Sequence, residues 1–229
     1  MKNKNRNILA LLIIILPFFF IAIGQKLLLK QNDYLVQEFL GYYMLLAIFG
    51  ISTIIATNKY LLKNKLSVFA SKNGKAIIDI ALSFLILAIM YLILSLADIS
   101  YNRWIEVQID RTAIESLLKE VFSNKLYALI FIGPFNWLNE GFLVLSLAFI
   151  LNNLWQLSKQ KLWIYLSIFL TSVMYAMLNI NQGIPSMITF LIILLISSFV
   201  YYKYRRIYPL LIARILFQTI SFITYWVYN

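Results

Sequence analysis

Long apolar runs separated by short polar segments constrain this chain more than any other feature. A run of about 20 apolar residues can cross the roughly 30 Å hydrocarbon layer of a membrane as a helix. With 62% apolar and 13% charged residues, the chain has more apolar surface than a soluble core can bury. The runs are continuous rather than alternating, which argues against a transmembrane β-barrel. The expected spans lie at about residues 8–25, 38–57, 76–97, 127–152, 162–180, 185–202 and 209–227.

We therefore predict an all-α, polytopic membrane protein, with the whole chain 1–229 forming a single membrane domain of about seven transmembrane helices. The first run follows the basic segment MKNKNRN, so a cleaved signal peptide is the alternative to a first transmembrane helix. This run is long for a signal peptide and AIGQ is a weak cleavage site, which favours a retained helix.

The basic residues are distributed unevenly over the connecting segments. If the N-terminus is inside, the inner segments hold thirteen basic residues and no acidic ones, whereas the outer segments hold six basic and seven acidic residues. The positive-inside rule then predicts a multi-pass protein of the plasma membrane with a cytoplasmic N-terminus and an outer C-terminus. The net charge of +11 resides in these short segments, so the lipid bilayer is an expected partner and nucleic acid is not.

Cysteine and histidine are both absent from the chain. Without cysteine there is no disulfide, no thiol nucleophile and no thiolate metal ligand. Without histidine the commonest general base and metal ligand is missing too. We expect neither a cofactor nor a metal.

The longest outer segment, residues 98–125, has its own helical pattern. Its apolar residues recur three and four positions apart, which is typical of an amphipathic helix lying at the membrane surface. The acidic balance of the segment argues against strong attraction to anionic lipid, and a solvated connecting helix is favoured over a partner-binding helix. The apolar positions are Ile105, Ile109, Ile114, Leu117, Leu118 and Val121.

Three charged residues fall within or near the expected spans. Asp79 lies at the start of its span, where a helix N-terminus favours an acid, so we interpret it as an interfacial cap. Glu140 and Arg214 lie deeper, where an ionisable group costs at least about 2.5–3.5 kcal/mol unless it faces protein or water. Polar residues continue from both at helical spacing, and a third polar stripe follows the span 162–180. These stripes comprise Asn136 with Glu140, Arg214 with Gln218, Ser221 and Tyr225, and Ser172 with Tyr175 and Asn179.

Polar stripes on membrane helices turn toward one another. They form either a polar internal site or hydrogen bonds that hold the helices together, and in the second case Arg214 would extend toward the inner headgroups.

The order and spacing of the stripes resemble the CAAX-protease and bacteriocin-processing (CPBP or Abi) family of intramembrane proteases. That family has the motifs E-E-x-x-x-R, F-x-x-x-H and H-x-x-x-N on successive helices. The corresponding segments here are NEGFLV (139–144), YAMLN (175–179) and RILFQ (214–218), within a likeness that covers about 128–225. The resemblance implies a CPBP-like core at 127–227, additional N-terminal helices at 1–97 and an outer loop at 98–125.

The departures from the family pattern are severe. Asn139 replaces the first motif glutamate, Val144 the arginine, and Asn179 and Arg214 the two histidines, so that Glu140 alone is kept. One glutamate, two amides and an arginine offer no zinc site, because zinc requires three or four His, Cys or carboxylate ligands. We therefore assign no catalytic residue. Glu140, Asn139, Asn179, Arg214 and Gln218 are interpreted as remnants of the family motifs.

Opposite charges in two segments that meet in the family fold predict a buried ion pair between Glu140 and Arg214. The resemblance then implies a protein that keeps the family fold without its peptidase activity. Such a protein would act through helix contacts, as a scaffold or regulator of a membrane partner or as a bacteriocin immunity factor. The alternatives are an active intramembrane CAAX-type endopeptidase with Glu140 as base, and a small transporter or channel subunit.

Overall fold

The computed structural model describes residues 2–28, 36–62, 76–104, 119–177 and 184–228. Within these ranges the chain is helical and contains no strand. The expected all-α class is confirmed. The α-helices are α1 (Lys2–Leu28), α2 (Val36–Ala56), α3 (Ala76–Trp104), α5 (Lys125–Ile130), α6 (Asn136–Leu157), α7 (Lys161–Met177), α8 (Ile184–Tyr204) and α9 (Tyr208–Tyr228), with π-helical turns η1 (Thr57–Leu61) and η3 (Phe131–Phe135).

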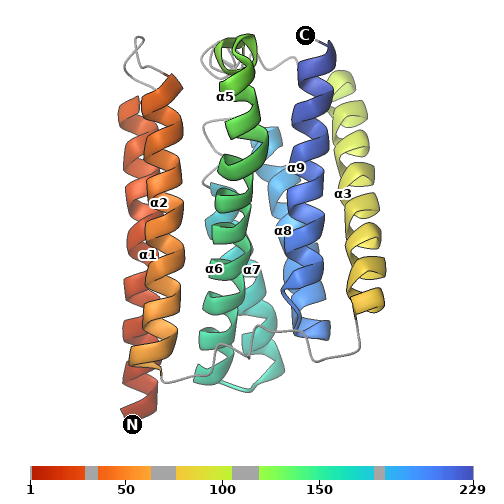
Figure 1. The fold of residues 1–229 in the computed structure, drawn as a ribbon. Coiled ribbons are helices and arrows are strands. Elements are labelled where there is room, and N and C mark those ends of the chain that lie inside the picture. Colours follow the sequence, from red (N-terminus) through yellow and green to blue (C-terminus); the bar gives the residue numbers. More distant parts are fainter. Residues whose placement is uncertain (1, 29–35, 63–75, 105–118, 178–183, 229) are drawn as a thin grey trace.

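The long helices lie side by side, and successive ones run in opposite directions (Figure 1). Helix α6 is central: α1 and α2 pack on one side of it, α9 on another, and α7 covers a third. Helix α3 packs against α9 and α8 at the far edge of the bundle. The N-terminus and the C-terminus therefore lie at opposite ends of the bundle. We call the end that holds the N-terminus, η1 and the connections 158–160 and 205–207 the basic end.

The central helix consists of three consecutive elements, α5, η3 and α6. Asn124 begins it, because its side-chain Oδ1 accepts a hydrogen bond from the backbone N–H of Leu126 at 2.9 Å and so satisfies a free N-terminal donor. Gly133 and Pro134 would interrupt a regular helix, but the π-helical turn η3 absorbs them and α6 continues to Leu157. The expected span 127–152 is thus observed as the continuous unit α5–η3–α6.

The largest difference from the predicted bounds lies at the end of α3. Helix α3 continues to Trp104, seven residues past the expected end at 97. The segment ADISYNRW contains neither glycine nor proline, so no helix-breaking residue ends the helix there. The surface helix expected within 98–125 falls mostly on 105–118, outside the described residues. Of its apolar positions Val121 is described, and it is buried.

Three segments of the structure are long and apolar enough to cross a membrane: Glu38–Leu61, Lys125–Leu157 and Met187–Tyr204. Shorter apolar stretches occupy the other long helices, at Asn5–Phe20, Ile77–Ile93, Lys161–Met177 and Tyr208–Thr224. Large apolar side chains are exposed along these helices, including Ile77 at 83% and Leu162 at 79%. Apolar surface this extensive is typical of lipid contact. The structure thus shows a helical protein with three segments that could cross a membrane, and the count of seven crossings stays a prediction.

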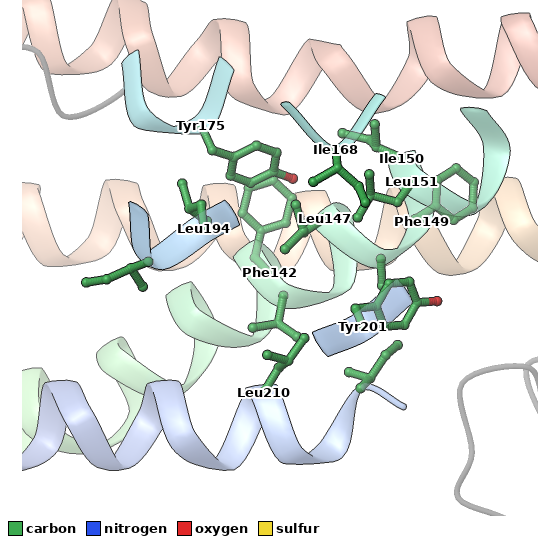
Figure 2. Packing of buried hydrophobic residues seen from close by; sticks show 14 of the residues in the cluster. Phe142, Leu147, Phe149, Ile150, Leu151, Ile168, Tyr175, Leu194, Tyr201 and Leu210 are labelled. Carbon is green, nitrogen blue, oxygen red and sulfur yellow. The ribbon is translucent and has the colours of Figure 1, made fainter. Parts of the chain in front are cut away.

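The apolar core is built around α6 (Figure 2). Phe142 lies at its centre, stacked on Phe18 of α1 with ring centroids 4.9 Å apart, and Tyr175 of α7 meets the edge of Phe18 at the same distance. Helix α2 approaches closely through Gly50: a Cβ atom there would lie 2.2 Å from Cε2 of Phe142. Only a glycine allows α2 to approach the Phe142 ring this closely.

Candidate functional site

The expected ion pair between Glu140 and Arg214 is present where α6 crosses α9. Arg214 donates from Nε to Oε2 of Glu140 at 2.6 Å and from Nη2 to Oε1 at 3.2 Å. The two side chains are only 6% and 5% exposed. Both carboxylate oxygens therefore accept from one planar guanidinium, which is the strong, two-point form of this interaction.

Helix α8 completes the surroundings of Arg214. Its guanidinium carbon lies 5.0 Å from the centre of the Phe190 ring, within the range of a cation–π contact. Arg214 does not extend toward the headgroups, which was the alternative in the sequence interpretation. Its charge is held inside the bundle by a carboxylate from α6 and a ring from α8.

A small cavity of about 10 Å³ adjoins the pair between α6, α8 and α9. Arg214, Val144 and the hydroxyl-bearing Ser197 are among its lining residues, and Glu140 is not. Val144 therefore lies at this site, as the motif spacing implied, but as part of an apolar wall. The volume is close to that of a single water molecule.

Asn136 extends the polar contact between α6 and α9 by one helical turn. Its Nδ2 donates to Oγ1 of Thr219 at 3.1 Å and to the backbone oxygen of Ile215 at 3.4 Å. Asn136 is 3% exposed, so its amide would otherwise be buried without a partner. We call the set Glu140, Arg214, Asn136 and Thr219 the charged interface.

The polar residues of α7 form separate contacts. The Tyr175 hydroxyl donates to Oγ of Ser146 on α6 at 2.6 Å, and the Ser172 and Ser198 hydroxyls lie 3.4 Å apart between α7 and α8. Ser146 in turn donates to the backbone oxygen of Phe142. No hydrogen bond joins these described α7 residues to Glu140 or Arg214, so the third stripe belongs to the packing between helices.

The other predicted residues lie near the charged interface without joining it. Asn139 donates to the backbone oxygen of Phe135, and Ser221 donates to that of Phe217, each within its own helix. Gln218 is half-buried on α9 and forms no hydrogen bond to another described residue. Asn179 lies outside the described residues.

A second carboxylate–arginine pair lies at the basic end. Asp79, near the start of α3, is ion-paired with Arg206 in the connection between α8 and α9. Asp79 is therefore more than the interfacial cap predicted for it: it joins α3 to α8 and α9. The sequence carried one signal for this pair, because Asp79 is the single acid close to a strongly basic set of segments.

The chemistry of the site follows from these contacts. Both oxygens of Glu140 accept hydrogen bonds from Arg214, so the carboxylate is engaged in a contact between two helices. Within the described ranges no three carboxylates gather as metal ligands. What the arrangement provides is a neutralised, two-point link between α6 and α9 at the middle of the bundle.

No model of a known protein family matches the chain, and neither does any curated protein or solved structure. The CPBP likeness thus stays a prediction that rests on the motif spacing. The functional conclusions below rest on the geometry of the charged interface.

Proposed function

We propose that this chain is a CPBP-like integral membrane protein without peptidase activity. It acts through contacts of its helices with a membrane or envelope partner, as a scaffold or regulator or as a bacteriocin immunity factor. The observation that carries this proposal is the engagement of both Glu140 oxygens by Arg214. The one acidic residue that the family motif keeps is used to hold two helices together.

The space around the pair supports a structural role. The adjoining cavity of about 10 Å³ has room for about one water molecule and none for an extended peptide. Breaking a buried pair by removing one partner costs about 3–5 kcal/mol, because it leaves a buried charge uncompensated. An endopeptidase with Glu140 as base would need to open this pair, and a transporter would need to hydrate it.

The proposal includes seven crossings of the plasma membrane, with the N-terminus in the cytoplasm and the C-terminus outside. Supporting this, Lys59, Lys159, Lys161 and Lys203 are exposed and lie in segments at the basic end (Figure 1). A basic end is retained on the cytoplasmic side during insertion.

The proposal is tested by comparing protein termini in the membranes of cells that carry the wild-type chain, lack it, or carry the double variant Glu140→Gln/Arg214→Gln. The double variant removes both charges together, so neither charge is left alone. Mass spectrometry of the termini should find the same set in all three. Termini that appear with the wild type and disappear in both other strains would show peptidase activity and overturn the proposal.

The contact role has its own measurement. A photo-crosslinking residue at an exposed lipid-facing position such as Leu45 or Leu162 should capture the same protein in wild type and double variant. If the wild type captures a partner protein and the stably folded double variant does not, Glu140 would have a role in activity rather than in folding. Ion flux into liposomes that depends on Glu140 would instead identify a transporter.

A further inference from the structure

The basic end holds an exposed arginine that is fixed in place and has no carboxylate partner among the described residues. The guanidinium carbon of Arg205 lies 4.1 Å from the Trp155 ring centre and 5.4 Å from that of Tyr202. Its Nη1 donates to Oδ1 of Asn152 at 3.3 Å. Arg205 has a φ of 54°, an uncommon backbone conformation for an arginine, and its N–H donates to the Tyr201 backbone oxygen at 2.8 Å. Both its backbone and its side chain are thus held.

The residues beneath Arg205 are themselves held. Asn152 donates to the Tyr201 hydroxyl at 2.6 Å, and the Trp155 Nε1 donates to Oγ of Ser167 at 2.9 Å. The rings of Trp155 and Tyr201 are stacked with centroids 5.9 Å apart. This platform joins α6, α7 and α8. A guanidinium supported in this way loses little conformational freedom when a ligand binds.

The charge of Arg205 is not neutralised by a described residue. Arg206 has Asp79 and Arg214 has Glu140, whereas the described contacts of Arg205 are two rings and an amide oxygen. A guanidinium carries five N–H donors, and one of them is used by Asn152. The remaining donors suit an anion with several oxygens, such as a phosphodiester.

The surroundings add to the attraction for an anion. Among the described residues, the basic end has four exposed lysines, Lys59, Lys159, Lys161 and Lys203, and one acid, Asp79, which is already paired. Helices α7 and α9 also begin at this end, without an acid in their first turns, so their positive dipole ends face the same region.

We propose that the basic end binds the headgroup of an anionic phospholipid, with Arg205 as the principal ligand. A lipid fits better than a free phosphate because the platform lies at the end of apolar helices. Leu162, Tyr204 and Tyr208 are exposed beside it, at the level where aromatic side chains meet headgroups. This inference uses the membrane setting but is independent of what the charged interface does.

The test is thermal unfolding of the purified full chain in neutral detergent with added lipid. Phosphatidylglycerol should raise the Tm by roughly 5 °C more than phosphatidylcholine does. Arg205→Gln should remove most of this difference. Arg205→Lys should remove about half of it, because lysine keeps the charge but does not stack on the rings. Lys125→Gln, at an exposed site on the opposite end, is the matched control and should keep all of it.

Three outcomes would overturn the proposal. They are equal Tm shifts from the two lipids, the same phosphatidylglycerol response in Arg205→Gln as in Lys125→Gln, or a full response to soluble glycerol phosphate at the same concentration. The last outcome would identify a free phosphate as the ligand. Native mass spectrometry gives a second readout that is independent of unfolding: the wild type should retain phosphatidylglycerol and Arg205→Gln should lose it.

Discussion

Helix α6 meets α9 on one side and α1 with α2 on another, and these two interfaces have opposite character. Toward α9 it presents Glu140 and Asn136, which pair with Arg214 and Thr219 through charge and hydrogen bonds. Toward α1 and α2 it presents Phe142, which packs on Phe18 and against the bare backbone of Gly50. We call the second set the apolar interface.

The difference between these interfaces is one of mechanism. Between helices in lipid there is little hydrophobic driving force, so association depends on close packing and on interhelical hydrogen bonds. The apolar interface depends on the fit of its side chains, so a side chain that becomes larger can be offset by a neighbour that becomes smaller. The charged interface depends on pairing. When one charge loses its partner, no change in the size of a neighbouring side chain can neutralise it.

The largest predicted effect comes from breaking the ion pair. Glu140→Gln or Arg214→Gln should each lower the free energy of unfolding by about 3–5 kcal/mol, because one charge is left buried without a partner. Unfolding by a denaturing detergent, followed by circular dichroism, measures this loss.

The double variant Glu140→Gln/Arg214→Gln completes the cycle. It should lose clearly less than the sum of the two single losses, since neither charge remains, with a coupling energy of about 1–3 kcal/mol. Equal and strictly additive losses would mean that the two side chains do not stabilise each other.

The next effect tests the apolar interface. Gly50→Ala places a Cβ atom against the Phe142 ring and should lower the free energy of unfolding by about 1–3 kcal/mol. Adding Phe142→Leu should restore part of the loss, because the smaller side chain makes room. The same unfolding assay applies.

Gly41→Ala is the matched control for this substitution. The added Cβ meets no atom within 4 Å, so the variant should be unchanged or stabilised by up to about 1 kcal/mol through its higher helix propensity. A loss at Gly41 as large as that at Gly50 would refute the role of close packing.

A smaller effect is expected where a hydroxyl joins α7 to α6. Tyr175→Phe removes the hydrogen bond to Ser146 and should lower the free energy of unfolding by about 1 kcal/mol. Ser146 keeps its bond to the Phe142 backbone, so no donor is left unsatisfied. Tyr165→Phe, on the exposed face of the same helix, should leave the unfolding curve unchanged.

The smallest effect belongs to the edge of the charged interface. Thr219→Val removes one acceptor of Asn136, which still reaches the Ile215 backbone oxygen, so the loss should stay near 0.5 kcal/mol. Thermal melting of Thr219→Val and of Asn136→Leu compares the loss of stability in the two variants. A loss of several kcal/mol in Thr219→Val would show that this end of the interface is as sensitive as the pair.

The helices could be predicted well from the sequence, because apolar runs bounded by polar segments are strong signals. The last two spans, expected at 185–202 and 209–227, are observed as Ile184–Tyr204 and Tyr208–Tyr228. The end of α3 was wrong by seven residues, since a polar but helix-compatible segment carries no stop signal.

The candidate site was predicted in part. Glu140 and Arg214 could be paired in advance, because the family resemblance brings their two segments together and opposite charges buried between helices need each other. Thr219 and Ser198 were missed, since the position of a small hydroxyl residue in an apolar helix does not indicate which neighbouring helix it will contact. Periodicity places Ser172 and Tyr175 on one face of α7, but it does not say that this face meets α6 and α8.

The sequence by itself determined the all-α class, the positions of the long helices and the need for Glu140 to have a partner. These depend on local hydrophobicity and on the cost of burying a charge, which are properties of short segments. The tertiary structure decided which helices touch, that Asp79 pairs with Arg206, and that Arg205 stacks on the Trp155 ring. Such contacts join residues far apart in the chain, and they depend on how whole helix faces fit together, which no local pattern encodes.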